Sequence, residues 1–177
     1  MMRSSTLAEQ DLPSPLETPD GAKAAELLAR FQGAAPMLCI AGRGPFDEAA
    51  ATVLAQLLTK HGLTARTAPH EAVSRRDVAQ LNLDGIAMIF VVYLAIDGMP
   101  SHLRYLLQRL RERVPAAKLV VGLWRSGEKV LNDADAQQEL GADLLVTTMR
   151  GAVEVGIAEA TGGKPARPAL SANSTAG

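Results

Sequence analysis

The chain has 177 residues, with 18 Lys and Arg against 19 Asp and Glu, so its formal net charge is −1. This length fits one domain with terminal segments, and the balanced charge argues against a dedicated binder of nucleic acid or acidic lipid. Hydrophobic residues form 47% of the chain but aromatic residues only 3%, which predicts an aliphatic core, and the single cysteine excludes a disulfide framework or a multi-cysteine zinc site.

Both ends of the chain are polar. Residues 1–33 are predicted to form a flexible segment with a short helix near 21–31, and residues 161–177, rich in small residues, Pro and Gly, to form a disordered tail. The N-terminus has no apolar stretch typical of a secretion signal. The longest apolar run, 85–96, is too short to cross a bilayer as a helix. We therefore expect a cytoplasmic location without membrane insertion, which also suits the lone thiol.

The folded unit is predicted at 34–160 and begins with an alternation of strand and helix. The apolar run 37–41 predicts a buried strand, and the apolar spacing over 47–61 predicts a helix that ends at Gly62. Residues 63–67 predict a second strand. A Ser-x-x-Asp capping pair then predicts a short helix over 74–81.

The second half of the unit continues this alternation. Residues 86–93 are continuously apolar, as expected for a central parallel strand covered on both faces. A helix over 101–114, capped by Ser101, and a strand over 118–124 come next. Further patterns predict a helix over 132–140, a strand over 144–148 and a closing helix over 152–160.

Five strands that alternate with helices predict an α/β fold: a doubly wound five-stranded parallel sheet of flavodoxin-like order 2-1-3-4-5, with helices on both faces. In such sheets ligands bind beyond the carboxyl ends of the strands, where the strand order reverses. This rule directs attention to the loops 42–47 and 94–101.

Several phrases within 41–160 resemble the cobalamin-binding domain family: KHGL at 60–63, Met-Pro at 99–100, Val-Gly at 121–122 and LGAD at 140–143. The family's cobalt-ligating His aligns with Asp47, and the Gly of the same motif aligns with Ala50. Cobalamin bound through a histidine ligand is therefore not expected. The alternative function is that of a corrinoid-binding protein without a protein His ligand.

A closer resemblance is to the soluble C-terminal extension of some bacterial transporters of the autoinducer-2 exporter (permease) family. It rests on LCIAGRGP at 38–45, PHEAVSR at 69–75, SHLRYL at 101–106 and VGLW at 121–124. The resemblance implies a cytoplasmic regulatory or sensing domain associated with a membrane transporter, either free-standing or part of a longer chain. It brings no catalytic residues.

The turn Gly42-Arg43-Gly44 lies between a strand and a helix and suits either an anion-cradling loop or a tight turn, with Asp47 capping the helix. Arg43 is the best candidate for holding an anion. No two of the three histidines stand at metal-ligand spacing, so no metal site is predicted. The acidic and lysine residues of a phosphoacceptor receiver domain are also absent from the expected strand ends.

Two other features have competing interpretations. The helix 101–114 carries four arginines, which form either a solvated face or, as a minority view, a docking surface for an acidic partner. Trp124 either packs over the sheet edge or serves a ligand or a protein interface. Phe46, Tyr93 and Trp124 are all expected near one sheet edge, and a groove that they fill would favour protein contact over ligand binding. Cys39 is expected to be buried and inert.

We therefore expect a non-enzymatic domain that binds a small ligand or a protein partner at the carboxyl edge of its sheet, with no cofactor. An enzyme that uses Arg43 and the histidines is a third possibility, but no nucleophile–base pair can be placed from the sequence. The predicted ligand-binding residues are Arg43, Asp47, His70, Asp97, Ser101, His102 and Trp124.

Overall fold

The computed structural model describes residues 27–94, 100–124 and 138–163. Within these residues, five strands form one sheet in the order β2-β1-β3-β4-β5, and every pair of neighbouring strands is parallel. This order confirms the predicted flavodoxin-like topology. The strands are β1 (Met37–Ala41), β2 (Ala65–Ala68), β3 (Met88–Leu94), β4 (Lys118–Trp124) and β5 (Leu144–Val146).

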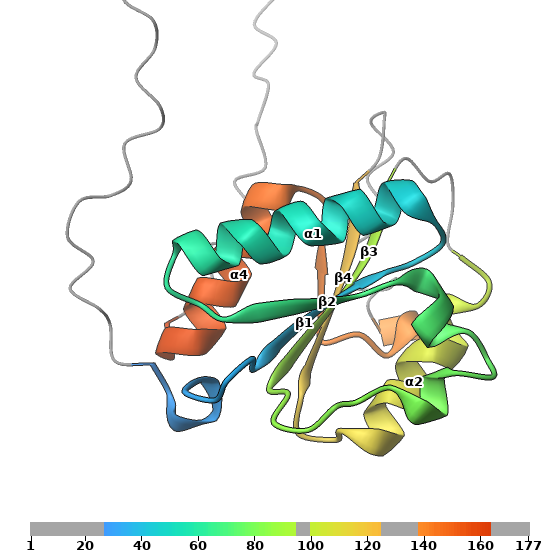
Figure 1. The fold of residues 1–177 in the computed structure, drawn as a ribbon, viewed down its shortest axis with the longest axis horizontal. Helices are drawn as coiled ribbons and strands as arrows, with labels where there is room; N and C mark the ends of the chain where they lie inside the picture. The colour runs from blue at the N-terminus through green and yellow to red at the C-terminus, as the bar shows by residue number, and fades with distance from the viewer. Residues whose placement is uncertain (1–26, 95–99, 125–137, 164–177) are drawn as a thin grey trace, which may run out of the picture.

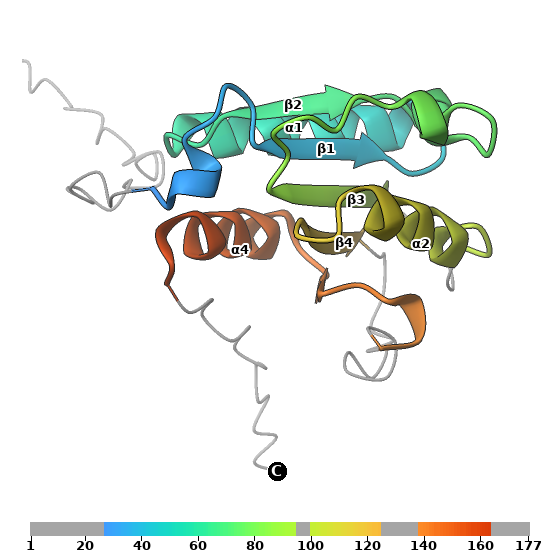
Figure 2. The same ribbon diagram turned by 90° about the horizontal axis from the view of Figure 1, so that it is seen from below.

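Helices cover both faces of this sheet (Figures 1 and 2). Helices α1 (Pro45–Lys60) and α4 (Met149–Thr161) lie side by side on one face, and α2 (Leu103–Arg113) lies on the other. Residues 138–140 are helical, while the rest of the helix predicted over 132–140 lies outside the described residues. Three short 3-10 helices complete the described elements: η1 (Ala29–Phe31), η2 (His70–Val73) and η3 (Val78–Gln80).

The sheet has a core on each face because successive side chains of a strand point to opposite sides. In β1, Met37 and Cys39 join the core under α1 and α4, whereas Leu38 and Ile40 join the core under α2. β3 and β4 alternate in the same way, and their central residues are fully buried. This burial on both faces explains why these strands are continuous apolar runs in the sequence.

Several predicted boundaries need correction. Helix α1 begins at Pro45 rather than at residue 47, since the fixed φ of proline suits the first helical position. The residue flanking α2 is His102, so the prediction that Ser101 caps this helix is wrong. Where a helix was predicted over 74–81, the Ser-x-x-Asp pair does form its hydrogen bonds, but only the three-residue η3 follows.

Two helices end at a glycine in the left-handed backbone conformation. Gly62 and Gly141 have φ values of +78° and +75°, the left-handed conformation that ends helices and that glycine adopts without strain. α4 begins earlier than predicted, at Met149, because Thr148 caps it: the Thr148 side chain accepts a hydrogen bond from Gly151 N at 3.0 Å.

The N-terminal side of the domain extends further than the sequence indicated. Phe31 is 2% exposed and belongs to the core under α1 and α4. Leu28 N donates a hydrogen bond to Ala160 O at 2.8 Å, and Arg30 pairs with Glu159 at 3.2 Å. The packed unit therefore begins before residue 34. Among the helices described, none has the length and apolarity needed to span a membrane.

Cys39 lies in the middle of β1 and is fully buried, as expected. Burial raises the pKa of its thiol from 9.0 to about 12, because the thiolate cannot be solvated there. The thiol ionises at a lower pH in the unfolded chain than in the folded domain. Its contribution to the free energy of unfolding is therefore fully present below pH 9 and is lost as the pH rises towards 12. We expect the free energy of unfolding to fall by about 1 kcal/mol between pH 8 and pH 10 from this group alone.

Urea unfolding of the wild type and of Cys39→Ala at pH 8, 9 and 10 tests this expectation. The variant is less stable at pH 8 because a buried group is removed, but its stability should decline less with pH. Burial also raises the pKa of Tyr93, whose contribution to the decline is common to both proteins. If the free energy of unfolding fell equally in the two proteins, folding would not raise the pKa of the Cys39 thiol.

Candidate functional site

The candidate site lies at the carboxyl ends of β1 and β3, where the strand order reverses. β1 continues into α1 through Gly42, Arg43 and Gly44, and β3 ends beside them at Leu94. Backbone N–H groups at a helix N-terminus and at strand ends of this kind commonly bind an anionic group of a ligand. The contents of this crevice therefore decide what the site can bind.

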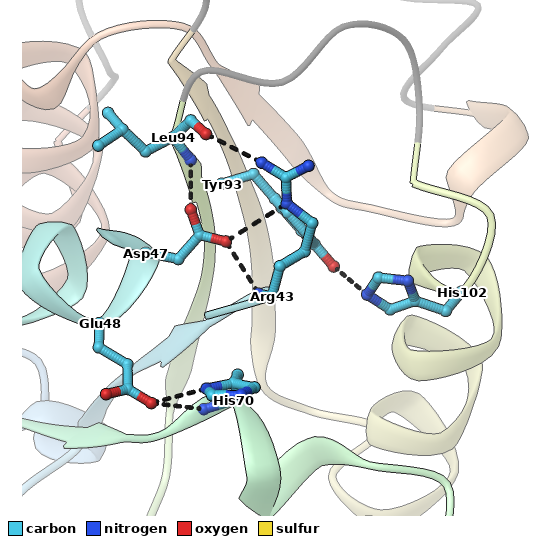
Figure 3. Close-up of polar contacts among 7 residues, drawn as sticks. All are labelled: Arg43, Asp47, Glu48, His70, Tyr93, Leu94 and His102. Carbon is cyan, nitrogen blue, oxygen red and sulfur yellow. Dashed lines mark hydrogen bonds and ion pairs between the residues drawn. The ribbon is translucent and has the colours of Figure 1, made fainter. Parts of the chain in front are cut away.

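Asp47 occupies the crevice (Figure 3). It lies in the first turn of α1 and is 2% exposed. Its Oδ2 accepts a hydrogen bond from Arg43 N at 2.8 Å, and its Oδ1 accepts one from Leu94 N at 2.7 Å. The carboxylate thus joins the loop after β1 to the end of β3. Asp47 is not the predicted helix cap, because Gly44, which has no side chain, occupies the N-cap position of α1.

Arg43 covers the same carboxylate from the solvent side. Its Nε lies 3.8 Å from Asp47 Oδ2, and one of its terminal nitrogens donates to Leu94 O at 3.2 Å. The side chain is about half exposed, at 48%. The guanidinium is therefore oriented by the chain itself, and its charge is partly balanced by Asp47.

Tyr93 fills the neighbouring space on the α2 side. Its ring packs against Gly42 so closely that a Cβ on Gly42 would lie 2.2 Å from the ring carbon Cε1. The residue is fully buried, its hydroxyl lies 3.0 Å from His102 Nε2, and burial together with the charge of Asp47 raises its pKa. The crevice between β1 and β3 is thus closed by two side chains of the domain, Asp47 and Tyr93.

His70 lies in a separate group on the β2 side of α1. Its Nδ1 is 2.7 Å from Glu48 Oε1 and 3.2 Å from Glu71 Oε2. The hydrogen bond with His70 lowers the pKa of Glu48. Figure 3 shows that Asp47 and Glu48, neighbours in the first turn of α1, point to different partners: Asp47 into the crevice and Glu48 towards His70.

The three aromatic residues share this edge but not one groove. Phe46 is 80% exposed, Tyr93 is fully buried on the α2 side, and Trp124 packs against the core on the α1 side. The Trp124 ring also covers Gly122, and its Nε1 has no hydrogen-bond partner among the described residues. Trp124 therefore has the packed position that was one of its two interpretations.

The structure does not gather all predicted site residues in one place. Arg43 and Asp47 are in contact, while His70 and His102 are held by different partners. Ser101 is exposed, and Asp97 lies outside the described residues. A shallow groove of about 350 Å³ lies elsewhere, between α1 and the edge strand β2; its lining includes Thr52, Gln56, Ala65 and Thr67 and none of the predicted site residues.

The arginines of α2 are mostly engaged within the domain. Arg111 pairs with Asp143 at 2.6 Å, Arg109 pairs with Glu112 at 3.0 Å, and Arg113 donates to the carbonyl oxygens of Val78 and Leu81 at 2.7 Å each. The contacts of Arg111 and Arg113 hold neighbouring segments to the helix, whereas the Arg109–Glu112 pair lies within α2. They do not favour a docking face for an acidic partner along the whole of α2.

Sequence reasoning did not include Glu48 and Glu71 among the predicted site residues, and it placed Tyr93 at this edge only as an aromatic residue that could fill a groove. Glu48 and Glu71 are ordinary surface residues by type, and only the tertiary fold brings them to His70. Their one local signal is position, since each lies in the first turn after a strand end. Tyr93 is hidden within an apolar run, although the glycine opposite the end of its strand is a sign of close approach.

Comparison with protein-family models, with curated proteins and with solved structures finds no match to this chain.

Proposed function

We propose that this chain is a non-enzymatic regulatory domain that binds a protein partner at the carboxyl edge of its sheet. The proposal is supported above all by the closed crevice between β1 and β3. Asp47 already accepts hydrogen bonds from Arg43 N and Leu94 N, and the Tyr93 ring rests on Gly42. A small anionic ligand would therefore find Arg43 N and Leu94 N already bonded and the space beside Gly42 filled by Tyr93.

The accessible residues around the crevice have the composition of a protein interface. Phe46 is 80% exposed in the first turn of α1, close to the half-exposed Arg43. Tyr105, in the first turn of α2, is 39% exposed and has the Arg75 guanidinium 5.4 Å from its ring centre. Aromatic residues and arginine are enriched where protein interfaces gain most of their binding energy. Both first turns lie at the carboxyl edge, on opposite faces of the sheet.

The resemblance to the soluble extension of autoinducer-2 exporter family transporters suggests the partner: a membrane transporter, which this domain would regulate from the cytoplasm. A corrinoid does not fit these residues. Asp47, at the position of the family's cobalt-ligating His, is buried with both oxygens hydrogen-bonded, and Tyr93 fills the adjacent space. Enzymatic function has no support either: among the residues that the structure describes, His70 contacts two carboxylates and His102 contacts the hydroxyl of the buried Tyr93.

A thermal-shift screen tests whether the domain binds a small molecule. Purified protein is mixed with 1 mM nucleotides, common metabolites or hydroxocobalamin. A compound present at about 100 times its Kd stabilises the folded state by about 2.7 kcal/mol and raises Tm by several degrees. We expect no such shift. A reproducible shift that disappears in Arg43→Ala would contradict the proposed closed site and favour ligand binding.

Photo-crosslinking in the native host tests the partner. A photoreactive amino acid replaces Phe46 in one protein and Val53 in a control; Val53 is also exposed on α1 but lies two turns further along the helix. We expect the first protein to form an adduct with a membrane transporter and the control to form none. An adduct of equal yield from both positions, or none from position 46, would contradict a docking surface centred on Phe46.

A further inference from the structure

We infer that Glu48, His70 and Glu71 form a binding site for a divalent transition-metal ion of the zinc class. The three residues offer one ring nitrogen and two carboxylate oxygens, and these donor atoms all lie within 4.8 Å of one another. This site is independent of the proposed protein partner.

The spacing of the donor atoms suits a metal. Two ligands of a tetrahedral zinc ion, each bound at about 2.0–2.1 Å, lie about 3.3 Å apart. His70 Nδ1 lies 2.7 Å from Glu48 Oε1 and 3.2 Å from Glu71 Oε2. Small rotations of the side chains would therefore be enough to place an ion between the three atoms.

Charge and hydrogen bonding leave the cluster incomplete without a cation. Two carboxylates approach the same ring nitrogen, which carries only one proton to donate. The imidazole supplies at most one positive charge against two negative charges. A divalent ion would accept electron pairs from all three groups and balance the charge of both carboxylates. The single proton on the ring nitrogen cannot bond fully to both carboxylates at once.

The backbone holds the three residues on well-formed elements. Glu48 lies in the first turn of α1, and its backbone N donates a helical hydrogen bond to Gly44 O at 3.0 Å. His70 and Glu71 open η2, whose turn is closed by hydrogen bonds from Ala72 N to Pro69 O and from Ser74 N to Glu71 O, both 3.1 Å. Sites on such elements keep their ligands in position.

The ligand set indicates the class of ion and its coordination. A nitrogen donor favours Zn²⁺ and similar transition metals over Mg²⁺ and Ca²⁺, which prefer oxygen alone. Three protein ligands leave at least one coordination position for water or for a group from another molecule. The side chains are accessible to solvent, with exposed fractions of 28% for His70, 36% for Glu48 and 68% for Glu71.

Equilibrium dialysis of the full chain against Zn²⁺ tests the site, with excess Mg²⁺ present to occupy unspecific carboxylates. We expect one zinc ion per chain. His70→Ala and Glu71→Gln should each weaken binding at least tenfold, since even residues that only support a metal ligand change affinity by about 10–100-fold. Glu71→Gln is a mild change at an exposed side chain, so its folding is not in question.

His61→Ala is the matched control, because His61 is an exposed histidine at the opposite end of α1. This variant should bind zinc as the wild type does. Co²⁺ provides a second measurement: its visible absorption bands should appear with the wild type and be lost with His70→Ala. No zinc retained by the wild type, or equal retention by His70→Ala and the wild type, would overturn the inference.

Discussion

Replacing Asp47 with Ala is expected to lower the free energy of unfolding by about 2–6 kcal/mol. The carboxylate is 2% exposed and accepts the hydrogen bonds of Arg43 N and Leu94 N. Its removal leaves both N–H groups without their partner, and each unsatisfied buried donor costs about 1–3 kcal/mol. Urea unfolding followed by circular dichroism measures the change.

Two further variants isolate the role of the carboxylate. Asp47→Asn keeps the shape and one acceptor oxygen, so we expect it to lie between Asp47→Ala and the wild type. Glu48→Ala removes the neighbouring, partly exposed carboxylate and should change stability much less than Asp47→Ala does. If Asp47→Ala were as stable as the wild type, the crevice would not depend on this residue, and the proposed function would lose its main support.

Replacing Gly42 with Ala is expected to cost about 1–3 kcal/mol or more, because a Cβ at this position would lie 2.2 Å from Cε1 of the Tyr93 ring. Both residues are buried, so the ring must move and disturb the core under α2. Thermal unfolding should show a decrease in Tm of several degrees. Gly44→Ala is the control, since no atom of the described residues lies within 4 Å of a Cβ added there and the Gly44 backbone is extended.

A double-mutant cycle identifies the cause of this loss. If the ring is the obstacle, Gly42→Ala should cost much less in a Tyr93→Leu protein, which has no ring against that position. An equal cost in both backgrounds would mean that Gly42 is required for another reason. In that case the packing of Tyr93 on β1 would not explain the closed crevice.

The sequence was sufficient to predict the strands and their order. β1 and β4 have the predicted limits, 37–41 and 118–124, because strands buried on both faces leave uninterrupted apolar runs between turn residues. The alternation of strands and helices predicts a parallel sheet, and 2-1-3-4-5 was chosen because it is one of the common orders of such sheets. These signals are local or nearly so, and a single sequence contains them.

The candidate site was only partly predictable. Its place in the fold follows from topology, and Arg43, Asp47, His70 and His102 were all expected there. Their partners were not, because each contact joins residues far apart in the chain: Asp47 with Leu94, His70 with Glu48, and His102 with the buried Tyr93. Asp47 looked like a helix cap or a ligand contact. Its actual role needs the end of β3, which no local pattern indicates.

The connection between β2 and β3 contains only η2 and η3, where a doubly wound domain ordinarily has a full crossover helix. Side chains attach it to helices on opposite faces of the sheet: His70 pairs with Glu48 of α1, and Arg113 of α2 binds the carbonyl oxygens of Val78 and Leu81. The connection also buries a few side chains, Val78 and Leu83 among them, in the core under α2. A segment with so few buried contacts opens at a lower free-energy cost than a full helix packed on the core. An ion or partner that strengthens or breaks the attachment to α1 would therefore change how readily the attachment to α2 opens. The connection between β2 and β3 thus links the helices on the two faces of the sheet.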